Sequence, residues 1–160
     1  MDTQTIEIIG RNRLINELLE AGMEVALPLR DRGIDLIAYA DSGSSITAFV
    51  AFPIQMKASS KRHFSIDKKY EKFPNLIHAF VWGISLVAPS MTFALTYPEA
   101  VEIGNQLGWT KTISWQRGAY NTQKPSKELI ALLEPYRMTR EAWKQKINNL
   151  LQIFQLSVTR

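Results

Sequence analysis

Two strand-like stretches joined by a turn cluster restrict the possible folds of this chain more than any other feature. The first covers 33–39 and the second covers 53–59, and both are rich in residues that suit a half-buried pleated surface. The cluster of Asp, Ser and Gly at 41–44 favours a turn between them. Because side chains alternate across a strand, Gln55 and Lys57 should share one face. The sequence therefore predicts a hairpin with one apolar face toward the core and one polar face.

The polar face carries three side chains that differ from their apolar surroundings, namely Asp35, Gln55 and Lys57. Carboxylate, amide and backbone carbonyl oxygens are the hard ligands that Mg²⁺ prefers, so Asp35, Gln55 and the backbone carbonyl of Met56 form a candidate ligand set. The Lys57 ammonium could orient a water molecule and offset negative charge that develops on a phosphate. This combination favours metal-assisted hydrolysis of a phosphodiester. The alternative is a structural hairpin in which Asp35 and Lys57 only form an ion pair.

Helices and strands alternate around this hairpin. Apolar residues at helical spacing predict a first helix over 5–21, ended by Gly22. The remaining elements are expected as strands at 23–29, 33–39 and 46–59, a helix at 65–73, strands at 76–86 and 91–97, a helix at 98–107, a strand or loop at 112–120, and helices at 126–133 and 139–154. Pro53 cannot donate to a ladder, so the third strand needs a bulge or a change of pairing partner at that point.

The expected fold class is α/β, with a mixed central sheet flanked by helices and with extra helices at the C-terminus. A chain of 160 residues with 46% hydrophobic residues suits one domain over 1–160. We expect its core over about 5–108 and a basic helical extension over about 109–160. The absence of cysteine excludes disulfides, thiolate zinc sites and a cysteine nucleophile. With only His63 and His78 in the chain, any metal should be held by oxygen.

Two motifs together resemble the PD-(D/E)XK nuclease superfamily. They are Gly-Ile-Asp-Leu-Ile at 33–37 and Ile-Gln-Met-Lys at 54–57, which follow a predicted helix that ends at Gly22. The resemblance is to the variant with Gln in the third motif, similar to Holliday-junction-resolvase-like and intron-associated endonucleases. It implies a restriction-endonuclease-like αβββαβ core, DNA as partner, Mg²⁺ as cofactor with Mn²⁺ as a substitute, and catalytic roles for Asp35, Gln55 and Lys57.

The sequence departs from that superfamily in its first helix, which usually supplies a further glutamate to the metal site. The corresponding position falls at Arg11, or at Asn12 if the register moves by one, and neither is a carboxylate. The nearby acids are interpreted as an exposed acidic face; they are Glu7, Glu17 and Glu20. Because this glutamate is missing, the chain could instead have a nuclease fold that does not cleave DNA.

Positive charge is concentrated toward the C-terminus. Residues 1–110 hold 10 Lys/Arg and 12 Asp/Glu, a net −2, whereas residues 111–160 hold 9 and 3, a net +6. Such asymmetry is typical of a phosphate-binding flank, although a solvated helix surface is an equal alternative. The side chains expected to contact nucleic acid are basic and lie near the hairpin or in the basic third: Arg30, Arg32, Lys61, Arg62 and Arg117.

Two hypotheses of different classes follow. The first is a Mg²⁺-dependent DNA endonuclease, and the second is a catalytically inactive nuclease-fold protein that binds DNA or regulates a mobile element. Without a membrane-length apolar run or a secretory pattern, a cytoplasmic location is expected. A twofold homodimer would place two sites against the two strands of a duplex.

Overall fold

A computed structural model describes residues 1–30, 32–40, 49–85 and 89–158. The turn cluster expected at 41–44 lies outside these residues. The elements, in chain order, are α1 (Thr3–Glu20), β1 (Met23–Ala26), β2 (Leu36–Ala40), β3 (Ala51–Ser59), β4 (Phe64–Asp67), the 3-10 helix η1 (Lys68–Tyr70), β5 (Ile77–Trp82), β6 (Met91–Thr96), α2 (Tyr97–Gln106), η2 (Trp109–Lys111), α3 (Ile113–Gln116), β7 (Ala119–Thr122), α4 (Lys127–Leu133), η3 (Glu134–Tyr136) and α5 (Arg140–Val158).

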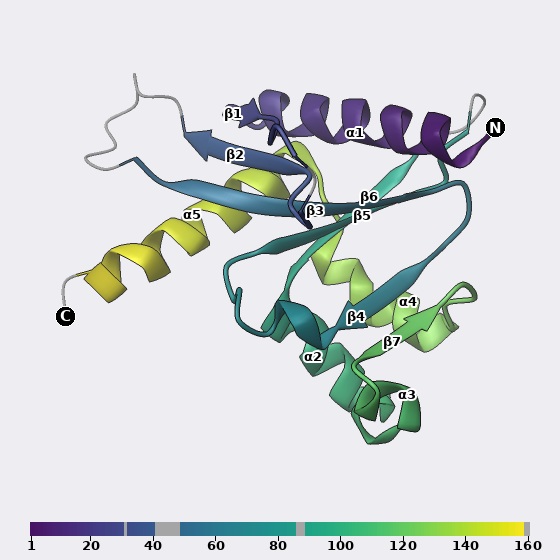
Figure 1. The fold of residues 1–160 in the computed structure, drawn as a ribbon. Helices are drawn as coiled ribbons and strands as arrows, with labels where there is room; N and C mark the ends of the chain where they lie inside the picture. The colour runs from purple at the N-terminus through teal and green to yellow at the C-terminus, as the bar shows by residue number, and fades with distance from the viewer. Residues whose placement is uncertain (31, 41–48, 86–88, 159–160) are drawn as a thin grey trace.

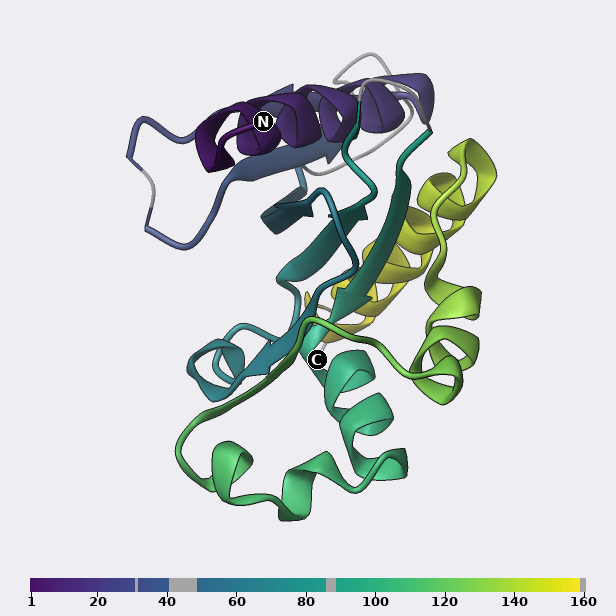
Figure 2. The same cartoon turned by 90° about the vertical axis from the view of Figure 1, so that its right-hand side faces the viewer.

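The central sheet is mixed, with strand order β1-β2-β3-β5-β6. Its neighbours are antiparallel except β3 and β5, which run parallel. In Figure 1, α1 lies along the upper side of this sheet, and α2, α3 and α4 lie below it. The turned view in Figure 2 shows the same separation, with purple α1 at the top and the green segments of α2 and α3 at the bottom. The predicted α/β class, with a mixed sheet flanked by helices and added C-terminal helices, is confirmed.

The segment between the two parallel strands differs from the prediction. The helix expected at 65–73 is wrong: residues 64–67 form β4 and only one 3-10 turn follows. Phe64 and Ile66 are buried while their neighbours are not, which is the period-two pattern of a strand. β4 pairs with β7 at 119–122, so only the end of the segment 112–120, expected as a strand or loop, is a strand. Residues 113–116 form the helix α3 instead, begun by the Thr112 side chain, which accepts a hydrogen bond from the Trp115 amide. The Asp67 carboxylate then accepts a hydrogen bond from the Lys69 amide and caps the 3-10 turn.

The proline in β3 marks a change of pairing partner, as predicted. β2 pairs with residues 51–54 of β3, and β5 pairs with residues 54–59. Pro53 therefore lies just before the β5 ladder begins, where a missing N–H costs little. Along β3 the side chains of Phe52, Ile54 and Met56 are buried, while Gln55 and Lys57 are only half-buried. The predicted assignment of Gln55 and Lys57 to the face opposite the buried residues is confirmed.

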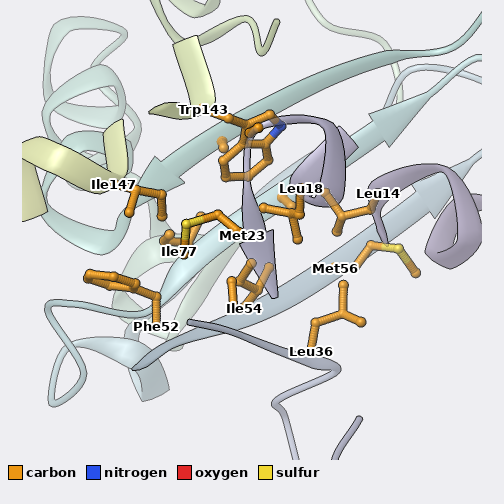
Figure 3. Close-up of a cluster of buried hydrophobic side chains, with 14 of the residues drawn as sticks. Leu14, Leu18, Met23, Leu36, Phe52, Ile54, Met56, Ile77, Trp143 and Ile147 are labelled. Carbon is orange, nitrogen blue, oxygen red and sulfur yellow. The ribbon is translucent and has the colours of Figure 1, made fainter. Parts of the chain in front are cut away.

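Two hydrophobic clusters lie on the two sides of the sheet. The first joins the sheet to α1 through Leu14 and Leu18 and to α5 through Trp143 and Ile147, as Figure 3 shows. The second joins the opposite face of the sheet to β4, α2 and α4 and includes Phe64. Within the described residues, none of the helices combines the length and apolarity needed to cross a membrane.

Candidate functional site

The candidate site lies where β2 and β3 separate. Their ladder ends at the Leu36–Ile54 pair, although the Asp35 amide still donates to the Ile54 carbonyl at 2.9 Å. Two residues further along β3, the Asp35 side chain replaces the missing strand partner: its Oδ2 accepts a hydrogen bond of 2.6 Å from the Met56 amide. Both backbone groups of a strand residue point toward the same neighbouring strand, so the Met56 carbonyl faces this side as well. The separation thus gathers backbone and carboxylate oxygens at one point.

A pocket of about 350 Å³ opens at this separation. All three polar residues singled out in the sequence line it, namely Asp35, Gln55 and Lys57, and so does Met56. The structure therefore brings together the proposed ligand and lysine residues. It also adds Glu7 from α1, which the sequence reasoning did not select.

Glu7 is exposed, as expected for the acids of α1, but it also lines the site pocket. The sheet-facing stripe of α1 contains the buried Gly10, Leu14 and Leu18. With 3.6 residues per turn, Glu7 continues that stripe by one turn toward the N-terminus. Gly10 permits close approach to β3, because a Cβ built there would lie 2.4 Å from the Ala58 Cβ. The spacing of Gly10, Leu14 and Leu18 was the sequence signal that pointed to Glu7.

The other acids of α1 have different surroundings. Glu17 is half-buried and accepts hydrogen bonds from Thr92 Oγ1 at 2.7 Å and from Trp143 Nε1 at 3.1 Å. Burial raises the pKa of the Glu17 carboxyl above its ordinary value, and the two hydrogen bonds oppose this effect. Glu17 is therefore a structural link from α1 to β6 and α5. Glu20, at the end of α1, is exposed as expected.

Arg11, which lies at the position expected for the superfamily glutamate, is ion-paired with Glu7 one turn earlier. Side chains four residues apart share a helix face, so the guanidinium lies beside the carboxylate that lines the pocket. Asn12 is exposed. The α1 contribution to the pocket is thus an Arg11–Glu7 pair in place of a single carboxylate.

Lys57 has an environment that disfavours its charge. Its pKa is lowered from the ordinary lysine value, first by burial and then by the positive charge of Lys69. The carboxylates of Asp67 and Asp35 partly oppose that lowering. Asp67 and Lys69 form their own ion pair at 3.4 Å at the start of the 3-10 turn. The charged residues Asp67 and Lys69 therefore influence the pKa of Lys57. They lie ten or more residues from Lys57 in the sequence, so the sequence analysis did not connect them with it.

Gln55 is positioned by a histidine on the neighbouring parallel strand. His78 lies directly opposite Gln55 in the β3–β5 ladder, and its Nδ1 lies 3.3 Å from Gln55 Oε1. The ring is buried and packs edge-on against Tyr70, with centroids 4.7 Å apart. Burial, followed by the charge of Lys57, lowers the pKa of His78 to about 4. At neutral pH the ring is uncharged, and a hydrogen bond between these two atoms requires the Nδ1–H tautomer, because a side-chain amide oxygen only accepts.

The expected nucleic-acid contacts are distributed unevenly. Lys61 and Arg62 are exposed and line a second pocket, of about 400 Å³, that shares Ala58 and His63 with the site pocket. Arg30 and Arg32 are exposed between β1 and β2, and they line neither the site pocket nor the second pocket. Arg117, at the end of α3, is likewise exposed and lines neither of these two pockets.

The donor set is compatible with a hard cation, although it is sparse. Across residues 1–30, 32–40, 49–85 and 89–158, no group of three or more His, Cys, Asp or Glu side chains lies in metal-binding proximity. The pocket instead offers two carboxylates, from Asp35 and Glu7, with the amide oxygen of Gln55 and the Met56 carbonyl. These are all oxygen donors, which suits Mg²⁺ or Mn²⁺.

Comparisons with known proteins give one structural likeness. No protein-family model matches the sequence, and no curated protein matches it. A solved structure of a bacterial homing endonuclease, I-Ssp6803I, is similar with a TM-score of 0.48 and 14% sequence identity. The likeness covers 99% of this chain and 99% of that one.

Proposed function

We propose that this protein is a Mg²⁺-dependent DNA endonuclease whose site is the pocket between β2 and β3. The observation that supports it is that Asp35, Gln55 and Lys57 line one pocket, with Glu7 entering from α1. A pocket that combines carboxylate, amide and ammonium groups suits a phosphodiester, because it offers metal ligands beside a positive charge. The alternative, in which Asp35 and Lys57 form only a structural ion pair, would predict no DNA binding.

Asp35, Gln55 and the Met56 carbonyl would hold the ion, with Glu7 as an added carboxylate. A bound Mg²⁺ would supply Lewis acidity and would lower the pKa of a bound water. The chain itself supplies the positioning: the Met56 amide fixes Asp35, and neutral His78 fixes the Gln55 side chain. Such fixed side chains lower the reorganisation required during reaction.

Lys57 would act on the phosphate and the water. Its ammonium lies in the same pocket as the oxygen ligands and could offset the charge that develops on the phosphate oxygens. The lowered pKa of Lys57 also makes the neutral amine more accessible than in an ordinary lysine, which assists proton transfer.

The test is cleavage of supercoiled and branched DNA by the purified chain in Mg²⁺, in Mn²⁺ and in EDTA. Lys57→Ala should abolish metal-dependent nicking, and Lys57→Arg should retain part of it. Lys144→Ala is the matched control, because Lys144 is an exposed lysine on α5 that lines none of the described pockets. Nicking that persists unchanged in Lys57→Ala would refute this assignment.

Glu7 deserves a separate variant, since the proposed site has few carboxylates. Glu7→Gln keeps the side-chain shape, removes one negative charge and should raise the Mg²⁺ concentration needed for half-maximal nicking. Glu20→Gln makes the same change at the exposed end of α1 and should leave the required Mg²⁺ concentration unchanged. Equal metal requirements in the two variants would exclude Glu7 from the metal site.

The second candidate is a nuclease fold that binds DNA without cutting it. It is favoured by the Arg11–Glu7 ion pair, which neutralises one of the two carboxylates of the pocket. The amide of Gln55 removes a further unit of charge attraction, worth about 4 kcal/mol at 4 Å and an effective dielectric of 20. DNA binding with no cleavage in either metal would support this candidate over the first. A homodimer remains a prediction, which sedimentation of the free protein would test.

A further inference from the structure

A groove with only positive charge continues from the candidate site along the β3–β4 turn. The second pocket shares Ala58 and His63 with the site pocket. A third pocket, of about 490 Å³, overlaps the second and extends to Trp82 and Met91. The residues common to the second and third pockets, which we name the basic groove, are Ser60, Lys61, Arg62, Gln123 and Lys124.

The charge becomes purely positive along this path. The site end mixes two acids, Glu7 and Asp35, with Lys57. Among the described residues that line the second and third pockets there is no acidic side chain, and the cations are Lys61, Arg62 and Lys124. All three are exposed, and none takes part in the ion pairs of the part of the chain that the structure describes. Three uncompensated cations at adjacent positions favour an extended polyanion.

Strand pairing holds these cations in place. β4 and β7 are far apart in the sequence, but their register sets Phe64 opposite Thr122. The residues before Phe64 therefore lie beside those after Thr122, which brings Arg62 and Lys124 to one groove. The turn is held by the Trp82 indole N–H, which donates to the His63 carbonyl at 2.6 Å. On the other side, the Lys124 amide donates to Thr122 Oγ1 at 3.2 Å.

From this placement we propose that the basic groove binds the phosphates of the DNA strand that lie on one side of the scissile phosphate, with Lys124 as an unrecognised contact. The inference rests on the proposed function for the position of the scissile phosphate. The groove starts at the pocket wall formed by Ala58 and His63, so a backbone leaving the site meets Lys61 and Arg62 first. Arg30 and Arg32 lie outside the basic groove.

The first test measures binding in EDTA, so that cleavage does not enter. Anisotropy of a fluorescein-labelled duplex is followed against salt for the full chain and for Arg62→Ala/Lys124→Ala. Each lost phosphate contact should lower the log–log salt slope by about 0.9, giving a fall of about 2 for the double variant. Lys111→Ala/Lys144→Ala removes the same charge from exposed positions outside the groove. Equal slopes in the two double variants would overturn the inference.

The second test reports proximity rather than charge. Because the chain has no cysteine, Gln123→Cys gives one attachment point for a benzophenone crosslinker inside the groove. Asn148→Cys places the same label at an exposed position of α5. Crosslinking to labelled DNA from position 123 and not from position 148 is expected, and the reverse pattern would overturn the inference.

These experiments distinguish the proposed nuclease activity from the proposed role of the basic groove. A lowered salt slope without cleavage in any metal would leave the basic groove intact and refute the nuclease. Mg²⁺-dependent cleavage with a salt slope unaffected by Arg62→Ala/Lys124→Ala would refute the groove alone. Absence of DNA binding by the unmodified chain at low salt would overturn both.

Discussion

The contact between Gly10 of α1 and Ala58 of β3 determines how close Glu7 can come to the pocket, and it can be tested by stability. A Cβ added at Gly10 would lie 2.4 Å from the Ala58 Cβ, whereas ordinary contacts begin near 3.4 Å. The Ala58 methyl is short and attached to a strand of the central sheet, so it cannot rotate away. Gly10→Ala therefore requires α1 and β3 to separate by about 1 Å.

Two opposing effects set the expected magnitude for Gly10→Ala. Replacing glycine by alanine inside a helix stabilises by about 1 kcal/mol. Overpacking a close contact costs about 1–3 kcal/mol. We expect the free energy of unfolding to fall, by up to about 2 kcal/mol, in urea denaturation. Gly104→Ala in α2 is the matched control: its nearest neighbour is the terminal methyl of Ile66 at 3.1 Å, which can shift, so little or no loss is expected.

A double-mutant cycle isolates the contact itself. Ala58→Gly removes the methyl that the new side chain would meet, so Gly10→Ala should be less costly in its presence. The expected coupling energy is about 1–3 kcal/mol in favour of the double variant. A coupling below about 0.5 kcal/mol, or stabilisation by Gly10→Ala alone, would refute the reasoning because the two groups would then not be in contact.

Three further predictions concern ionisable groups. Burial lowers the pKa of His78 from 6.5 to about 4, so the folded protein resists protonation of this ring. The free energy of unfolding should therefore fall as pH drops below 6.5, by about 3 kcal/mol in total below pH 4. In urea titrations at a series of pH values, His78→Gln should lack this pH-dependent loss of stability. Glu17 should have the opposite pH dependence, because its raised pKa means that the folded state holds the proton more tightly than the unfolded state. The free energy of unfolding relative to Glu17→Gln should therefore fall as pH rises above 4.5. A difference between the two proteins that does not change with pH would contradict the buried position of Glu17. If the Lys57 ammonium supports cleavage, activity should begin to decline with rising pH at a pH below the ordinary lysine pKa of 10.5. In Lys57→Arg the decline should move to higher pH, because arginine keeps its charge. If the two proteins lose activity over the same alkaline pH range, deprotonation of Lys57 is not the cause of the decline.

Local patterns were sufficient for most elements and for the orientation of β3. Alternation of apolar and polar residues predicted that Gln55 and Lys57 face away from Ile54 and Met56, and the burial along the strand agrees. The prediction of a helix at 65–73 was wrong. There, pairing of β4 with β7 supplies the backbone hydrogen bonds that a helix would otherwise have provided.

Sequence by itself determined what this chain can offer a ligand: oxygen donors without cysteine thiolates, one lysine beside them, and an excess of positive charge in its last third. Tertiary structure decided which residues distant in the sequence join them. His78 lies opposite Gln55 because the parallel register is set by the crossover between β3 and β5, and Lys124 joins Arg62 because β7 pairs with β4. Side-chain periodicity depends on neighbours a few residues away, whereas register and helix docking depend on packing across the whole fold, and that packing carries Glu7 to the pocket.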